Sequence, residues 1–320
     1  MILKLNKLDK IFLTGATGFV GTNLMPYLQK AGFATTSISR NPREKEIGYD
    51  ACLSGRQAFS EKTWNNANAM IHLAGKAHDL KKTSNDSEYF EVNYELTKKL
   101  YDQFLGSNAQ QFIYISSVKA AADEVIGILT EEVIPNPVTA YGKSKQMAEA
   151  YIMANLPSTK KVYILRPCMI HGPGNKGNLN LLYSLVSKGF PWPLGTFANQ
   201  RSFLSIENLC FVIKELLSQN SIPSGIYNVA DNVPRSTNEL IQLIAASQNK
   251  QASIFHISKG FIVRLAKLGD KLHLPLNSER LQKLTENYVV SNRKIVTAIG
   301  KSLPIGSKEG LLKTFESFIH

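Results

Sequence analysis

Three side chains in the middle of the sequence have the types and spacing needed to move a proton at a hydroxyl group. Tyr141 and Lys145 are separated by one helical turn in a segment with a helical pattern, so they lie on one face. A free tyrosine has a pKa of about 10 and is a poor base at neutral pH, but a neighbouring ammonium together with the positive ring of a bound cofactor would lower this pKa. Ser117 closes the strand expected before this helix and could hydrogen-bond to the same substrate oxygen. We therefore predict a catalytic set of Ser117, Tyr141 and Lys145.

A glycine-rich turn near the start of the sequence could bind a phosphate-containing cofactor for this chemistry. Glycines recur every three residues, at 15, 18 and 21, from the turn after an apolar run at 11–13 into the start of a helical pattern at 19–30. Such glycines let the backbone approach a pyrophosphate closely, and the helix start offers free N–H groups to it. A tight turn without a ligand is the alternative, but the flanking strand and helix favour a dinucleotide site. We expect contacts from Gly15, Thr17, Gly18, Phe19, Val20 and Gly21, and from Tyr141 and Lys145.

The end of the second expected strand bears on which dinucleotide binds. No Asp or Glu stands there to hold the ribose hydroxyls of NAD, whereas Arg40 could meet the 2′-phosphate of NADP. A loop that happens to be basic is the alternative. The sequence favours NADP over NAD.

These groups need a scaffold of alternating strands and helices, and the sequence predicts one. Up to Pro167 the pattern is typical of βαβ units, with strands expected at 11–13, 34–39, 69–73, 111–116 and 162–166 and helices at 19–30, 87–105 and 141–155. We therefore predict an α/β fold with a Rossmann-type doubly wound parallel sheet. Residues 1–167 would bind the dinucleotide and 168–320, richer in Pro and Gly at first, would form a smaller C-terminal substrate-binding domain. A strand near 225–230 would return to the first sheet.

Composition narrows the class of protein. The net charge of +12 comes from basic residues scattered singly or in pairs, so we expect no nucleic-acid partner. No apolar run reaches the length of a membrane span, and the first ten residues do not resemble a secretory signal. Cys52, Cys168 and Cys210 are too far apart for a disulfide framework, and no ligand spacing suggests a metal. A cytoplasmic protein is the simplest interpretation.

One segment leaves two interpretations open. Residues 261–271 are amphipathic and could lie on a membrane surface. A helix packed over the substrate pocket has the same pattern, and the sequence favours packing.

The chain resembles a known family, the extended short-chain dehydrogenases that modify nucleotide sugars. The resemblance runs along nearly the whole chain and rests on motifs at 14–21, 72–75, 92–93, 115–117, 141–145, 165–167 and 171–174. It implies that Ser117, Tyr141 and Lys145 are catalytic. It also implies that the stretch from His72 through Leu73, Ala74 and Gly75 lines the nicotinamide side, and that Asn93 ties a helix to the sheet.

The same resemblance extends to the substrate side. It implies that Asn178 and Leu179 contact the nucleotide diphosphate at a helix start, that Arg201 holds a phosphate, and that Lys119 contacts substrate. An ordinary helix cap and a surface arginine are the alternatives for Asn178 and Arg201. The run 191–195 falls where the family packs the nucleobase, and a homodimer is common in the family.

Three reactions share such a scaffold. A dehydratase would be expected to carry an acidic pair directly after Ser117, where this chain has Val118 and Lys119, so dehydration is disfavoured. Reduction at C4 of a UDP-linked keto-deoxy amino sugar, in surface polysaccharide synthesis, is slightly favoured because of Arg40. A UDP-sugar 4-epimerase, acting on UDP-glucose or UDP-N-acetylglucosamine, is a close alternative. A cofactor-binding regulator without catalysis is the third, although such relatives usually lose the tyrosine that this sequence keeps.

Overall fold

The computed structural model describes residues 10–39, 51–54, 66–76, 85–175, 177–272 and 276–318. Arg40 lies outside the described residues, as do its basic neighbours Arg43 and Lys45. Asn178 is described only as the first residue of a helix, without its side chain.

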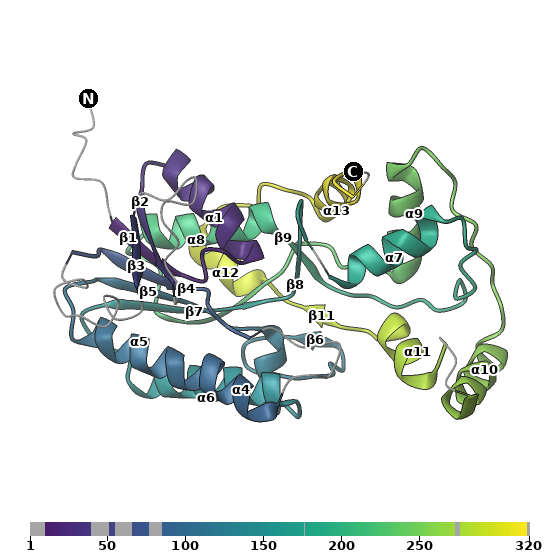
Figure 1. Ribbon diagram of the computed structural model, residues 1–320, viewed down its shortest axis with the longest axis horizontal. Helices are drawn as coiled ribbons and strands as arrows, with labels where there is room; N and C mark the ends of the chain where they lie inside the picture. Colours follow the sequence, from purple (N-terminus) through teal and green to yellow (C-terminus); the bar gives the residue numbers. More distant parts are fainter. Residues whose placement is uncertain are drawn as a thin grey trace.

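A seven-stranded sheet with every strand parallel forms the centre of the larger of the two parts of the molecule, here called the sheet layer (Figure 1). Its order is β3-β2-β1-β4-β5-β7-β10. The strands are β1 (Lys10–Thr14), β2 (Ala34–Ser39), β3 (Ala51–Ser54), β4 (Ala69–His72), β5 (Gln111–Ile115), β7 (Lys161–Pro167) and β10 (Gly225–Val229). The order reverses between β1 and β4, and ligands bind in such sheets outside the carboxyl ends of the strands at this point.

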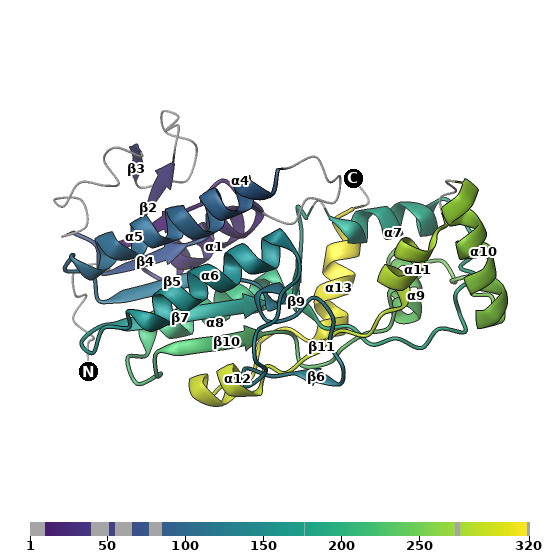
Figure 2. The same ribbon diagram turned by 90° about the horizontal axis from the view of Figure 1, so that it is seen from below.

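Helices cover both faces of the sheet, because successive strand residues point to opposite sides (Figures 1 and 2). Ile11 and Leu13 of β1 face one apolar cluster, and Phe12 between them faces the other. The first cluster is completed by α1 (Phe19–Lys30), α8 (Ile206–Ser218) and α12 (Arg293–Ile299), and the second by α5 (Leu96–Leu105) and α6 (Ala140–Ala154). The predicted doubly wound Rossmann-type sheet is therefore confirmed.

The prediction of one continuous α-helix at 87–105 is wrong in one respect. The segment consists of α4 (Asp86–Phe90), a π turn (Glu91–Glu95) and α5. The wider turn holds Asn93, whose carbonyl accepts a hydrogen bond from Thr97 Oγ1 at 2.7 Å. Periodicity over this length does not reveal a single wider turn, and such turns are frequent at functional sites.

The chain after β7 contributes to the sheet layer and also forms a smaller, mostly helical layer. It supplies α8, β10 and α12 to the sheet layer, so the strand expected near 225–230 does pair with β7. The rest forms a third apolar cluster at the far end of the molecule (Figure 2), around α7 (Asn178–Ser187), α9 (Thr237–Ser247), α10 (Lys259–Leu272), α11 (Ser278–Thr285) and α13 (Ser307–Glu316). Two short pairs connect the layers, β8 (Met169–His171) with β9 (Phe203–Ser205) and β6 (Ile128–Leu129) with β11 (Val289–Val290). No helix in the described ranges is long and apolar enough to cross a membrane.

Candidate active site at the carboxyl edge of the sheet

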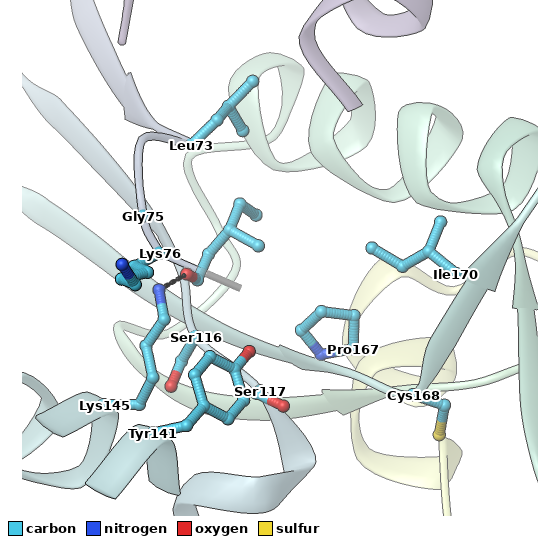
Figure 3. Close-up of a pocket in the computed structure, with 11 residues that line it drawn as sticks. Leu73, Gly75, Lys76, Ser116, Ser117, Tyr141, Lys145, Pro167, Cys168 and Ile170 are labelled. Carbon is cyan, nitrogen blue, oxygen red and sulfur yellow. Dashed lines mark hydrogen bonds between the residues drawn. The ribbon is translucent and has the colours of Figure 1, made fainter. Parts of the chain in front are cut away.

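A cavity of about 210 Å³ opens at the carboxyl ends of β4, β5 and β7 (Figure 3). All three residues of the predicted catalytic set line it, as do two of the residues expected beside the nicotinamide. The full lining is Leu73, Gly75, Lys76, Ile115, Ser116, Ser117, Tyr141, Lys145, Pro167, Cys168 and Ile170. Residues far apart in the sequence therefore meet at the edge where the fold places ligands.

The start of α6 is fixed so that Tyr141 faces Ser117. Thr139 caps the helix by accepting a hydrogen bond from the Gly142 N–H at 3.1 Å, and the Asp123 carboxylate accepts from the Thr139 N–H and hydroxyl. A Cβ on Gly142 would lie 2.5 Å from the Lys119 carbonyl oxygen, so only glycine lets α6 come this close to the turn after β5.

Burial raises the pKa of Tyr141 above its ordinary value, and a hydrogen bond with Ser117 opposes this shift. The phenol of nearby Tyr89 adds to the increase. The cost of burying a phenolate thus outweighs the stabilisation by Ser117. The lowering expected from Lys145 together with a positive nicotinamide ring concerns the protein with cofactor bound.

Lys145 lies beneath the cavity. Its ammonium donates to the Ile115 carbonyl oxygen at 2.9 Å and lies 4.8 Å from the centre of the Tyr114 ring. Burial lowers the pKa of Lys145 to about 8, and the negative charge of Glu149 opposes that shift. The side chain thus remains mostly protonated at neutral pH.

A buried network behind Lys145 is not apparent from the sequence. Glu149, one turn further along α6, accepts from Ser116 Oγ at 2.5 Å and from Arg166 Nε at 3.0 Å and Nη2 at 2.5 Å. Glu149 and Arg166 are both nearly fully buried. The four-residue spacing of Glu149 from Lys145 indicates that both lie on one face of the helix. The sequence does not show that Arg166, on the neighbouring strand, would pair with Glu149.

We expect that replacing Glu149 with glutamine lowers the free energy of unfolding by about 3–5 kcal/mol, because Arg166 would remain buried without its counter-ion. Urea denaturation would measure this. The double replacement Glu149→Gln with Arg166→Met should cost less than the sum of the two single changes. Lys283→Gln is the control, since its pair with Glu279 is more than half exposed and should contribute less than about 1 kcal/mol. Equal losses for Glu149→Gln and Lys283→Gln would contradict the expectation.

The glycine-rich turn has the geometry that a pyrophosphate requires. Gly15 has a φ of +72°, and a Cβ there would lie 2.6 Å from the Ala74 nitrogen. A Cβ on Gly21 would lie 2.5 Å from the Ala16 and Gly15 oxygens. No side chain caps α1, which leaves its first N–H groups available. Thr17 and Gly18 are exposed, and Phe19 and Val20 are partly exposed.

The stretch after β4 divides between the cavity and the core. Leu73 and Gly75 line the cavity, whereas His72 is fully buried, so the expectation that it lines the nicotinamide side is wrong. Its ring lies between Thr14 Oγ1 at 2.6 Å and Thr97 Oγ1 at 2.9 Å. Burial lowers the pKa of His72 to about 3, so the ring is neutral and joins the ends of β1 and β4 to α5.

Asn93 joins the π turn to the segment after β4. Its side chain accepts from the Lys76 N–H at 2.8 Å and donates to the Lys76 carbonyl at 3.1 Å and to Ser144 Oγ at 3.1 Å. Asn93 thus has a structural role, as the resemblance implied, but its side chain ties the π turn to the segment after β4 and to α6 rather than to a strand.

The residues predicted to contact substrate lie outside the cavity lining. Lys119 Nζ lies 4.3 Å from the Tyr288 ring centre, and Arg201 lies 3.5 Å from the Glu286 carboxylate and donates to the Lys283 carbonyl at 2.8 Å. The charges of Arg201 and Glu286 both act on Lys119, so the two cations lie in one neighbourhood. Their contact with substrate stays a prediction.

The side chains expected to contact the nucleotide on α7 and at 191–195 are mostly buried. The side chain of Leu179 belongs to the third apolar cluster, which leaves its backbone N–H in the first turn of α7 as the group able to meet a ligand. Trp192 and Leu194 are buried in the same cluster, and Trp192 Nε1 donates to Asn238 at 2.9 Å.

Comparison with known proteins places these features in context. The family model for the NAD dependent epimerase/dehydratase family matches residues 11–230. The chain is 30% identical to UDP-glucose 4-epimerase from Vibrio cholerae, over 97% of this chain and 95% of that protein. It is 26% identical to GDP-6-deoxy-D-mannose reductase from Pseudomonas aeruginosa, over 74% and 79%. UDP-N-acetylglucosamine 4-epimerase from Bacillus cereus has the same fold, with a TM-score of 0.74 over 97% and 98% of the two chains at 19% identity.

Proposed function

The chain belongs to the NAD dependent epimerase/dehydratase family, and we propose that it inverts C4 of a UDP-linked sugar as a 4-epimerase. The observation that carries the proposal is the meeting of Ser117, Tyr141 and Lys145 in one cavity beside the glycine-rich turn. A 4-epimerase oxidises C4 to a ketone and then reduces the other face of the sugar, so the reaction has no net redox change.

The residues present fit a nicotinamide dinucleotide. The positive φ of Gly15 and the close approaches at Gly15 and Gly21 make the turn suited to a pyrophosphate, which Thr17, Gly18, Phe19 and Val20 would also contact. Leu73, Ala74 and Gly75 would lie beside the ring. When bound, the cofactor supplies the acceptor and donor of hydride.

Each member of the catalytic set has a role that its position supports. Tyr141 Oη takes the proton of the C4 hydroxyl and later returns it, and Ser117 Oγ holds the same oxygen. Lys145, mostly protonated at neutral pH, stabilises the phenolate. Because burial raises the pKa of Tyr141, the further lowering that a neutral-pH base needs would come from the positive charge of the oxidised ring.

We propose that residues 1–167 hold the dinucleotide and that the nucleotide sugar lies against the chain after 168, with Lys119, Asn178, Leu179 and Arg201 near its phosphates. The neighbourhood shared by Lys119 and Arg201 supports this, since two cations suit a diphosphate. The uridine and the homodimer also remain proposals, the former supported by the relative from Vibrio cholerae.

Reduction of a 4-keto sugar is the second candidate. It is supported by the relative named as a GDP-6-deoxy-D-mannose reductase and by Arg40, which would favour NADP. We place epimerisation first because the epimerase relative is matched over nearly the whole of both chains.

Identification of the cofactor tests the choice. The purified protein would be denatured and the released small molecules identified by mass, since an epimerase regenerates its cofactor at each turnover and retains it. We expect tightly held NAD, together with interconversion of UDP-glucose and UDP-galactose or their N-acetyl forms. An empty site that saturates with NADPH, and consumption of NADPH with a 4-keto sugar, would favour the reductase instead.

A further inference from the structure

Helix α10 exposes an apolar stripe at the end of the molecule farthest from β3 (Figure 1). Four large side chains spaced by four, three and four residues are between 38% and 59% exposed, namely Phe261, Leu265, Leu268 and Leu272. With about 3.6 residues per turn, this spacing places all four in one narrow sector of the helix. The sequence favoured packing for this segment, but the packing involves a different sector.

The inner face of α10 is already occupied. Its buried residues are Ile262, Ala266 and Gly269. A Cβ on Gly269 would lie 1.9 Å from the Leu276 carbonyl oxygen, so the helix contacts the segment that leads into α11 without space for a side chain. The exposed stripe is therefore a second apolar face, on a helix held in place by the first.

A row of positive charge runs beside the exposed stripe. Arg264, Lys267 and Lys271 are exposed and lie on the side of the stripe away from the buried face, as their spacing of three and four residues requires. Within the described part of the chain none of the three has an ion-pair partner. Asp270, the single acidic residue of α10, accepts from the N–H at 2.9 Å and the hydroxyl at 2.6 Å of Ser278, the first residue of α11.

We propose that α10 binds the surface of an anionic phospholipid membrane. The apolar stripe would enter the boundary between headgroups and acyl chains, and the basic row would contact lipid phosphates. An apolar stripe bordered along its length by cations is complementary to a membrane surface, where apolar acyl chains lie beneath negatively charged headgroups. The net charge of +12 adds attraction at longer range. Such attachment requires no membrane-spanning segment.

Sedimentation with vesicles tests the proposal on the full-length protein. We expect binding to vesicles of equal parts phosphatidylcholine and phosphatidylglycerol, and little binding to phosphatidylcholine alone. The triple variant Arg264→Gln, Lys267→Gln, Lys271→Gln should bind about 100-fold more weakly, at about fivefold for each charge. Leu268→Ser should weaken binding by about tenfold.

Matched variants separate this surface from general charge and general apolarity. Lys188→Gln, Lys250→Gln and Lys308→Gln together remove the same charge from exposed positions elsewhere and should leave vesicle binding within about threefold of wild type. Leu185→Ser on α7, which has no charged residue, removes a leucine that is 49% exposed, against 48% for Leu268, and should also leave binding unchanged.

Two results would overturn the proposal. The first is no binding of wild type to anionic vesicles, and the second is equal weakening by the two charge triples. If the first result came with loss of self-association in Leu268→Ser, measured by analytical centrifugation, the stripe would instead be an interface between copies of the chain. Vesicle binding does not depend on the sugar chemistry, so either proposal can fail while the other stands.

Discussion

Replacement of Tyr141 with phenylalanine is expected to lower turnover by about 10²–10⁴-fold, because the group that exchanges a proton with the C4 hydroxyl is lost. Affinity for the dinucleotide should change little, since the ring still fills its place in the cavity and the glycine-rich turn is untouched. Steady-state rates with UDP-glucose, and titration calorimetry with NAD after removal of the retained cofactor, would measure the two quantities separately. A regulator without catalysis would show no such division.

Tyr89→Phe is the matched control for this change. Its ring lies edge-on to that of Tyr141, with 6.1 Å between the ring centres, so it removes a second phenol close to the same site. Tyr89 does not line the cavity, and its replacement should change turnover by less than about threefold. If Tyr141→Phe kept turnover within that same range, the phenol would not be the proton-transfer group.

Replacement of Gly15 with alanine is expected to weaken NAD binding by about 100-fold, the scale of loss that follows a displacement of about 1 Å in a positioned site. The added Cβ would lie 2.6 Å from the Ala74 nitrogen and 2.9 Å from the Leu73 carbonyl carbon, so the turn and the segment after β4 must move apart. Both segments contribute residues expected to contact the dinucleotide. Titration calorimetry with NAD would measure the loss.

Gly32→Ala separates this effect from simple backbone strain. Gly32 also has a positive φ, of +91°, but a Cβ there would meet no atom within 4 Å. Both alanine variants should lose about 1–2 kcal/mol of stability to the left-handed conformation. Only Gly15→Ala should lose NAD affinity, and equal affinities in the two variants would show that the turn does not hold the cofactor.

Local patterns predicted the scaffold well, and the three residues of the predicted catalytic set meet in one cavity. The helix expected at 19–30 is α1, and the strand expected at 34–39 is β2, because periodicity and turn residues record local structure directly. Ser117, Tyr141 and Lys145 meet because the carboxyl end of β5 and the start of α6 lie at one edge of a parallel sheet.

Features that depend on tertiary contacts were not predictable. The π turn at Asn93 leaves the overall helical pattern intact, and the Glu149–Arg166 pair joins a helix to a strand that spacing alone does not bring together. The direction of the Tyr141 pKa shift depends on how deeply the phenol is buried, which a sequence does not specify. The charge of α10 was readable, but which of its two apolar faces would stay exposed was not.

A crystal structure with NADH bound tests the catalytic account most directly. We expect the nicotinamide to enter the cavity between Leu73 and Ser117. The reactive ring carbon should lie within about 3.5 Å of the position of the sugar C4, and Tyr141 Oη within about 3.5 Å of the position of the C4 oxygen. A nicotinamide bound elsewhere, or a Tyr141 hydroxyl turned away from it by more than the breadth of a sugar ring, would contradict the proposed chemistry.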